Sequence, residues 1–352
     1  KNVRNHKYML KLARDDLRII NSLKPDVIAI DVRISAMAAA LTTNTPVFFI
    51  TGSAGLPYDI YIPNIFRLPR MVHSASQKPL LKLIHIARER MFIKTIIRLV
   101  SDLNSKEVPI KDILHKVRFI VPEEKFYLPM LTRKSNVSYV GHINWNGFGA
   151  KAKEALDFKD KGKKIIYLTF GGTGFDRSKL IQLARELILR EFNVIVSTST
   201  IADPEEFPKS PNLLVYRYVP AKLANKLADV VVCHGGYGTM MDALLAGKPV
   251  VTVPFNPDQW LHSVRLEELG MGICTTRANL KILANSLLLK WNNVQQIGEQ
   301  VKIDKIMECI ENVITNYDKF NENIARFTAK ISHKKPLQEA SRVITNGWSH
   351  SS

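Results

Sequence analysis

Short apolar segments recur along the second half of this chain, and stretches with helical periodicity separate them. The apolar segments cover residues 165–170, 193–197, 213–219, 227–233 and 250–253. Continuous runs rich in Val and Ile are typical of parallel strands that are buried on both faces. Their alternation with predicted helices indicates an α/β domain built on a parallel sheet.

The first half contains the same alternation with fewer elements. Its pattern predicts a helix at 9–23, a strand at 26–31, a helix at 35–41 and a strand at 47–50. Residues 141–164 then carry glycine and charge with little periodicity, which is typical of a linker. Because 352 residues exceed the usual size of one domain, we predict two Rossmann-like domains that face each other across a cleft. They are residues 1–150 and 151–315, and helices are expected over 316–352.

A glycine-rich turn joins the predicted strand at 227–233 to a helix expected at 239–245. The turn consists of His234, Gly235, Gly236, Tyr237 and Gly238. Glycine permits positive φ and lets a ligand approach the backbone N–H groups closely, and a helix N-terminus carries partial positive charge. The turn therefore has the chemistry of a site for a diphosphate.

Two further loops point to the same end of the predicted sheet. Gly171, Gly172 and Thr173 follow the strand at 165–170 and form a second phosphate-facing turn. Asp258 and Gln259 are expected in the loop after the strand at 250–253. In open α/β sheets, ligands bind at the carboxyl ends of the strands.

The stretch CHGGYGTMMDALLAGKPVVTVPFNPDQ, residues 233–259, resembles the donor-binding signature of the GT-B glycosyltransferases. The likeness is greatest to the nucleotide-sugar-dependent family that includes glucuronosyltransferases and macrolide glycosyltransferases. The matching positions are His234, Gly235, Gly236, Gly238, Thr239, Ala243, Leu244, Gly247, Pro249, Pro254, Asp258 and Gln259. Two positions differ, because Asp242 stands where the pattern has Glu, and His262 where it has Asn. The alternative, glycines that serve packing alone, explains neither the histidine nor the Asp-Gln pair.

This resemblance implies a GT-B fold, whose last helix crosses back to the amino-terminal domain, and a role for each matching residue. Gly235, Gly236, Gly238 and Thr239 would hold the diphosphate, with the turn at 171–173 nearby. His234 would contact the phosphate next to the sugar, Asp242 the ribose, and Asp258 with Gln259 the sugar hydroxyls. The base would lie against Tyr218, Val219 and Pro220. No metal and no cofactor are implied, only a nucleotide-sugar co-substrate, expected to be a UDP-sugar.

The resemblance also implies a catalytic pair in the amino-terminal domain. In inverting members a histidine in the first turn deprotonates the acceptor hydroxyl, and an Asp at the end of a later strand orients it. Asp31 matches that Asp, whereas no residue here corresponds to the histidine. We therefore expect residues 1–150 to form an acceptor-binding domain that lacks its first strand and turn. A strand-end cap is the alternative role for Asp31.

Charge extends this interpretation to partners. The net charge is +18, of which +12 lies in residues 1–150 and +6 in 151–352. Residues 78–98 predict a basic amphipathic helix, either lying on an anionic membrane surface or packing on its own domain. No zinc-finger spacing or RNP-like motif indicates specific nucleic-acid binding. The three cysteines show no CxxC spacing, and no apolar run approaches the ~18 residues of a membrane span, so a cytoplasmic protein is expected.

We thus expect a glycosyltransferase that moves a sugar, hexosyltransferase-like, from a nucleoside-diphosphate sugar to the hydroxyl of a small-molecule or lipid acceptor. The mechanism is expected to be metal-independent and inverting. Three alternatives stay open. They are a lipid-directed glycosyltransferase at an anionic membrane surface, a nonhydrolysing nucleotide-sugar epimerase on the same fold, and a donor-binding protein without turnover.

Overall fold

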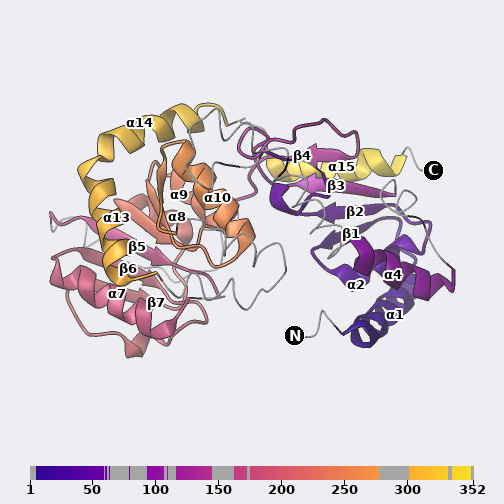
Figure 1. Ribbon diagram of the computed structural model, residues 1–352, viewed down its shortest axis with the longest axis horizontal. Helices are drawn as coiled ribbons and strands as arrows, with labels where there is room; N and C mark the ends of the chain where they lie inside the picture. Colours follow the sequence, from indigo (N-terminus) through magenta and orange to yellow (C-terminus); the bar gives the residue numbers. More distant parts are fainter. Residues whose placement is uncertain are drawn as a thin grey trace. The chain divides into compact units, whose positions relative to one another are not determined.

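The computed structural model divides into two compact units (Figure 1). It describes residues 5–58, 60–61, 63, 79, 93–106, 109, 116–144, 162–172, 175–276, 301–331 and 335–349. Unit 1 comprises Lys1–Tyr61, Ala75–Ile143 and Ser332–Ser352, and unit 2 comprises Ile62–Ser74 and Asn144–Ile331. Most of the predicted basic helix at 78–98 lies outside the described residues, as does Thr173.

Unit 1 is built on a four-stranded parallel sheet in the order β1-β2-β3-β4. The strands are β1 (Ile28–Asp31), β2 (Val47–Ile50), β3 (Val117–Val121) and β4 (Val137–Tyr139). The helices are α1 (His6–Leu23), α2 (Ile34–Leu41), α4 (Lys94–Asn104) and α15 (Pro336–Ser349), with a short 3-10 helix, η2 (Ser53–Gly55).

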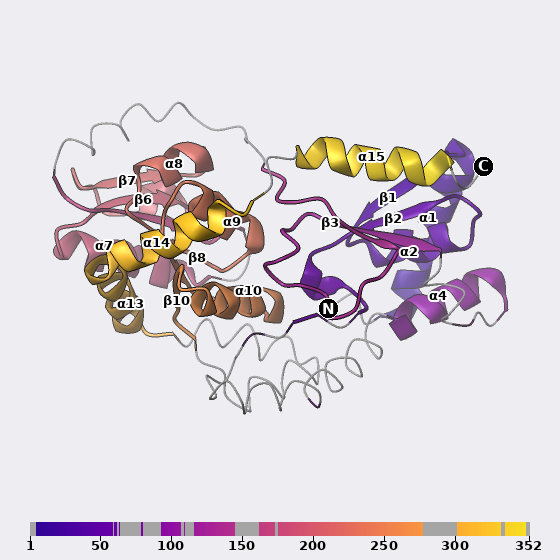
Figure 2. The same ribbon diagram turned by 90° about the horizontal axis from the view of Figure 1, so that it is seen from above.

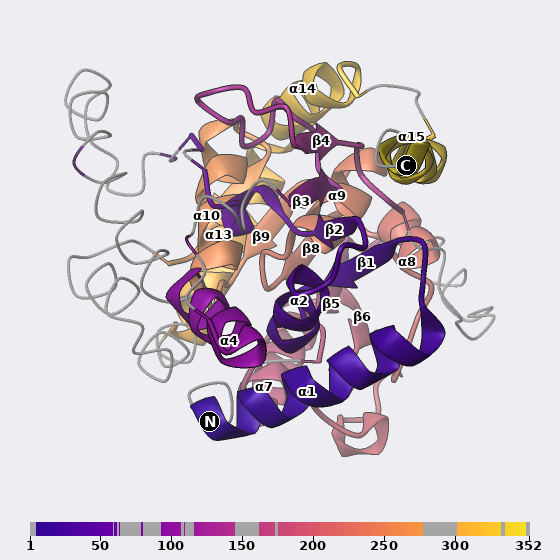
Figure 3. The ribbon, with the colours of Figure 1, turned by 90° about the vertical axis from the view of Figure 1, so that its right-hand side faces the viewer.

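The two faces of this sheet bury different helices, as the alternation of side chains in β2 shows. Val47 and Phe49 pack with residues of α1, α2 and α4 (Figure 3). Phe48, between them, points to the opposite face and packs with Val343 and Ile344 of α15 (Figure 2). The last helix of the chain therefore completes the core of unit 1, although α14 (Tyr317–Thr328) before it belongs to unit 2.

Unit 2 is built on a six-stranded parallel sheet in the order β10-β9-β8-β5-β6-β7. The strands are β5 (Ile165–Thr169), β6 (Asn193–Ser197), β7 (Leu213–Tyr216), β8 (Val230–Cys233), β9 (Val250–Thr252) and β10 (Gly272–Cys274). The helices are α7 (Arg177–Leu189), α8 (Ala221–Leu227), α9 (Tyr237–Leu245), α10 (Pro257–Glu268), α13 (Ile303–Thr315) and α14, with a 3-10 helix, η5 (Pro204–Glu206). The expectation of an α/β fold with two parallel sheets is thus confirmed.

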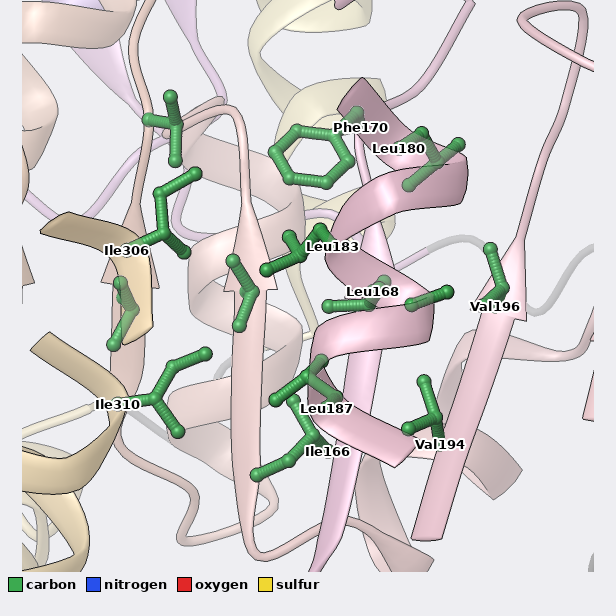
Figure 4. Close-up of a cluster of buried hydrophobic side chains, with 14 of the residues drawn as sticks. Ile166, Leu168, Phe170, Leu180, Leu183, Leu187, Val194, Val196, Ile306 and Ile310 are labelled. Carbon is green, nitrogen blue, oxygen red and sulfur yellow. The ribbon is translucent and has the colours of Figure 1, made fainter. Parts of the chain in front are cut away.

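The main core of unit 2 lies between one face of its sheet and the helices α7 and α13 (Figure 4). The labelled side chains are Ile166, Leu168, Phe170, Leu180, Leu183, Leu187, Val194, Val196, Ile306 and Ile310. All ten are buried, and burial of this apolar area is the main stabilising contribution to such a domain. The opposite face, which includes Tyr167 and Cys233, is covered by α8 and α9.

The strand order reverses between β5 and β8. From β5 the chain proceeds to β6 and β7 on one side, and then returns to place β8 on the other side of β5. The loops after β5 and β8 consequently lead to helices on opposite faces, α7 and α9. At such a switch point the two loops diverge and leave a crevice at the carboxyl ends of the strands, where α/β proteins bind ligands.

Candidate functional site

The two glycine turns predicted from the sequence lie at this switch point, next to each other. The ring of His234, which follows β8, contacts both turns. A β-carbon on Gly171, after β5, would lie 3.5 Å from its Cε1, and one on Gly236 would lie 2.5 Å from its Nε2. Glycine at position 236 therefore leaves space that the imidazole occupies, whereas a β-carbon at position 171 would make only an ordinary contact with the ring.

His234 is neutral near pH 7 because of where it lies. Burial lowers the pKa of its imidazole, and the Thr169 carbonyl and the Asp258 carboxylate offset this only in part by favouring the charged ring. A neutral imidazole has one N–H donor, which the Thr169 carbonyl can accept, and protonation gives the ring a second donor for a ligand oxygen. Phosphate oxygens are acceptors of the kind that such a donor suits.

The backbone of the turn after β8 is shaped by Gly235. Its φ is +83°, in the region that favours glycine. A β-carbon there would overlap the Ser263 hydroxyl and would lie 3.0 Å from the Gln259 carbonyl oxygen, both on α10. The Ser263 hydroxyl in turn donates a 2.7 Å hydrogen bond to that carbonyl. Gly235 thus lets α10 pack directly against the turn.

The helix that follows, α9, begins shortly after the carboxyl end of β8. It begins two residues before the predicted start, at Tyr237, and Gly236 caps it without a side chain. The first N–H groups of a helix have no intrahelical acceptor, so this end attracts anions. A β-carbon on Gly238 would meet nothing within 4 Å, while Thr239 and Asp242 lie further along α9 and are partly buried.

The turn after β5 is held from a neighbouring loop. Gly171 has a φ of +66°, and the carbonyl of Gly172 accepts a 3.1 Å hydrogen bond from the Thr200 hydroxyl in the loop after β6. Ser199, beside it, also has a positive φ of 50°. Thr173 lies outside the described residues. The two loops are therefore coupled at the edge of the crevice.

Asp258 and Gln259 lie in a helix, so the loop expected from the sequence is wrong. Pro257 is the first residue of α10, and the Asn256 side chain accepts a 2.9 Å hydrogen bond from the Gln259 N–H. A capping Asn before Pro is a helix start signal. The Gln259 side chain points inward, where its Oε1 accepts from the Phe255 N–H at 2.9 Å, whereas Asp258 is exposed.

The three residues proposed to contact the base lie after β7, which ends at Tyr216 and not at residue 219 as expected. Tyr218 is an exposed large side chain, 53% accessible, and Val219 beside it is buried. Pro220 precedes α8 as its N-cap. An exposed aromatic ring on a fixed backbone is suited to stacking on a planar ligand.

Sequence reasoning missed a buried polar cluster behind the turns. Burial raises the pKa of the Tyr167 phenol to about 12, partly offset by hydrogen bonds with Thr169 and Ser197, and nearby Cys233 and Asp242 also raise it. The phenol therefore stays neutral. Thr169 and Ser197 are register partners at the ends of β5 and β6. The available signal was the alternation of Tyr167 and Thr169 with apolar residues in β5, together with Ser197 at the end of β6.

Asp31 lies at the carboxyl end of β1 in unit 1, with its side chain exposed. Val32 after it has a φ of +49°, which is strained for a β-branched residue. Arg33 then makes two hydrogen bonds with the buried Asp16 of α1, at 2.7 and 3.2 Å. This pair fixes the turn that carries Asp31.

Replacing Arg33 by alanine is expected to lower the free energy of unfolding by about 1–2 kcal/mol, because it leaves the Asp16 carboxylate buried without these two bonds. The matched control is Arg18→Ala, which removes an exposed pair with Asp15 and is expected to cost less than about 0.5 kcal/mol. Urea unfolding of both variants measures the difference. Equal costs would contradict a role for the pair in holding the turn.

Three further observations on the described residues concern metal ligands, cysteines and membrane-spanning helices. No cluster of three or more His, Cys, Asp or Glu side chains suited to a metal ion occurs among these residues. The three cysteines are free and buried, and burial raises the pKa of Cys233 to about 12. Among the described helices, none combines the length and apolar character needed to cross a membrane.

Comparison with known proteins gives one family match and several relatives. Residues 165–313 match the family described as the glycosyltransferase family 28 C-terminal domain. A PGL/p-HBAD biosynthesis rhamnosyltransferase of Mycobacterium bovis is 29% identical over 289 residues, which are 77% of this chain and 61% of that protein. A sterol 3-beta-glucosyltransferase of Aspergillus oryzae is 26% identical over 198 residues, 51% of this chain and 14% of that protein. This chain thus spans about three fifths of the first relative and a small part of the second.

Solved structures extend the similarity over nearly the whole chain. The calicheamicin glycosyltransferase CalG4 has a TM-score of 0.62 at 17% identity, covering 97% of this chain and 79% of that one. Os79 from O. sativa, solved in complex with UDP, has a TM-score of 0.62 at 13% identity, covering 99% and 84%. At such identities the likeness shows the fold.

The fold of this chain is therefore that of the GT-B glycosyltransferases, as the resemblance implied. Its relatives by sequence are named as enzymes that transfer sugars, and the family match covers the unit that carries the glycine turns. Together these findings show the GT-B fold and, over residues 165–313, a likeness to the glycosyltransferase family 28 C-terminal domain.

Proposed function

We propose that this chain transfers a sugar from a nucleoside-diphosphate sugar to an acceptor hydroxyl, without a metal ion and with inversion at the anomeric carbon. The observation that carries the proposal is the position of His234, which lies between two glycine turns and beside the N-terminus of α9 at the switch point of the sheet. Fixed N–H donors that surround a departing diphosphate stabilise its charge, which is electrostatic catalysis.

The donor would lie along the carboxyl edge of the sheet of unit 2. Its diphosphate would accept hydrogen bonds from the turns at 171–172 and 235–239, and from His234. Asp242 would bind the ribose and Asp258 the sugar. Because Gln259 uses its Oε1 on the Phe255 N–H, only its amide nitrogen is assigned to the sugar. The base would stack on Tyr218, which is exposed for that contact.

The acceptor chemistry is proposed to be a hydroxyl, activated with the help of Asp31 as the orienting carboxylate. UDP is the nucleotide proposed first because Os79 was solved with UDP, and thymidine diphosphate is its rival because the spinosyn rhamnosyltransferase SpnG was solved with it. A lipid-directed acceptor is the second candidate, favoured by the net charge of +12 in residues 1–150 and by the sterol 3-beta-glucosyltransferase among the relatives.

Calorimetric titration of UDP, dTDP and GDP tests the donor site directly. We expect saturable binding of one nucleotide to the wild type. The double variant His234→Ala, Asp242→Ala loses hydrogen bonds to charged or polar ligand groups, each worth about 1–3 kcal/mol, so its affinity should fall at least tenfold. Circular dichroism on both proteins checks that they are folded.

Two outcomes would contradict the proposal. If the folded wild type binds none of the three nucleotides, the glycine turns serve packing alone. If it binds one but releases no nucleoside diphosphate from the corresponding nucleotide sugar with any acceptor or with water, the chain is a donor-binding protein without turnover.

A further inference from the structure

His262 is a buried polar side chain on the edge of the proposed donor site. It stands where the resembling signature has Asn, and its side chain is only 1% exposed. Its Nε2 lies 3.5 Å from Oδ1 of Asp258, one helical turn earlier on α10, and the Asp258 side chain is 56% exposed. One partner of the pair is thus inside the protein and the other faces solvent.

The ring of His262 is held from a second direction by α9. Its centroid lies 5.4 Å from that of Tyr237, at an interplanar angle of 52°. Tyr237 is the first residue of α9 and is itself buried. The imidazole therefore fills the space between the first turn of α9 and the second turn of α10, and its orientation is set by packing and not by the ligand.

The position of Asp258 is fixed by the same elements. It lies in the first turn of α10, which is anchored by the Asn256 cap and packed against Gly235 through Ser263. A carboxylate on an exposed side chain normally samples several rotamers, and ordering it on ligand binding costs free energy. The Nε2 of the buried His262 ring lies 3.5 Å from the carboxylate, and an N–H at that atom would reduce this cost in advance.

We propose that His262 is a positioning residue of the glycosyl subsite, holding the Asp258 carboxylate ready to accept hydrogen bonds from hydroxyl groups of the donor sugar. The inference rests on the proposed function and adds to it the residue that sets the geometry of the sugar contact. The ring binds one carboxylate oxygen, and the other stays available to the sugar. The ligand class is a nucleotide sugar with hydroxyls in reach of Asp258, and the nucleoside diphosphate alone makes no use of the pair.

The test compares a nucleotide with its sugar conjugate, so that contacts to the sugar are separated from contacts to the diphosphate. Titrations use UDP with UDP-glucose, and dTDP with dTDP-rhamnose, on the wild-type chain, His262→Phe, His262→Asn and Asp258→Ala. Phe keeps a ring against Tyr237 but has no N–H group. Asn restores the residue of the signature and keeps a donor. Thermal unfolding of each variant checks the fold.

We expect His262→Phe to lower affinity for the sugar conjugate about 5- to 30-fold while leaving affinity for the free nucleotide within about twofold. His262→Asn should recover part of the loss, since its amide also donates. On the Asp258→Ala background, His262→Phe should have no further effect on the sugar conjugate, because the two residues act as one unit.

Three results would overturn the inference while leaving the proposed function intact. One is an equal loss for nucleotide and sugar conjugate, which would mean that His262 only supports the packing of α9 on α10. Another is no loss at all in His262→Phe. A third is additive losses in the double variant. If instead the folded wild type binds neither ligand of either pair, the proposed function fails first.

Discussion

Replacing Gly235 by alanine is expected to abolish nucleotide binding and to lower the free energy of unfolding by about 2–4 kcal/mol. Alanine at this position would have to adopt a φ of +83°. Its β-carbon would also displace the Ser263 hydroxyl and the Gln259 carbonyl. To relieve the overlap, α10 must move away from the turn, and Asp258 moves with it. Urea unfolding and nucleotide titration measure the two effects.

Gly247→Ala is the matched control, because Gly247 also has a positive φ, 74°, but a β-carbon there meets nothing within 4 Å. It should cost only the backbone strain, about 1 kcal/mol, and leave nucleotide binding unchanged. Adding Ser263→Ala to Gly235→Ala removes the overlapping hydroxyl and should restore part of the stability. If Gly235→Ala behaves like Gly247→Ala, α10 does not depend on the turn.

Five of the six parallel strands of unit 2 could be predicted because each contains a run of consecutive apolar residues, whereas β10, with three residues, was not predicted. β6 was predicted to the residue, as was β2 in unit 1, since β2 is apolar over its length and β6 has three apolar residues between Asn193 and Ser197. β7 was expected to run three residues too far, because Arg217 and Tyr218 leave the sheet after Tyr216 while the sequence continues with large side chains. The local sequence pattern indicates which residues are buried, but it does not indicate where the pairing of a strand with its neighbour ends.

Other elements were missed because their formation depends on distant partners. The four residues of β3 that precede Val121 include Arg118, and β4 has only partly buried side chains, so neither stands out as an apolar run. β3 is a strand because it pairs with β2, which lies far from it in the sequence, and β4 is a strand because it pairs with β3. Similarly, Asp258 and Gln259 were expected in a loop although Asn256 and Pro257 are start signals for the helix α10.

The candidate site, too, could be predicted from the sequence only in part. The order and spacing of the residues in the turn after β8 were enough to predict its members, because a glycine turn before a helix is a local structure. The contact between His234 and Gly171 was not predictable, since it depends on β8 pairing with β5. The burial of His262 likewise depends on how α9 packs beside α10, which no single segment encodes.

The second large effect on donor affinity is expected at His234. Its imidazole should take up a proton when a donor binds. In the free protein, burial holds the pKa of the imidazole below its usual value near 6.5. A diphosphate beside the ring brings negative charge and therefore raises that pKa. Between the two pKa values the complex binds more protons than the free protein, so affinity must rise as pH falls through that window.

We therefore expect the affinity for a nucleotide sugar, whose diphosphate does not titrate in this range, to rise as pH falls from 7.5 towards 5.5, with net proton uptake. His234→Ala should weaken binding at pH 6 about 10- to 150-fold, the loss of a hydrogen bond to a charged group, and should flatten the pH profile. Titration in two buffers of different ionisation enthalpy measures the uptake. Asp258→Ala is the control for the other titratable group that acts on the ring, and it should keep the pH dependence. A profile in His234→Ala as steep as that of the wild type would show that another group takes up the proton, and that His234 does not contact the diphosphate.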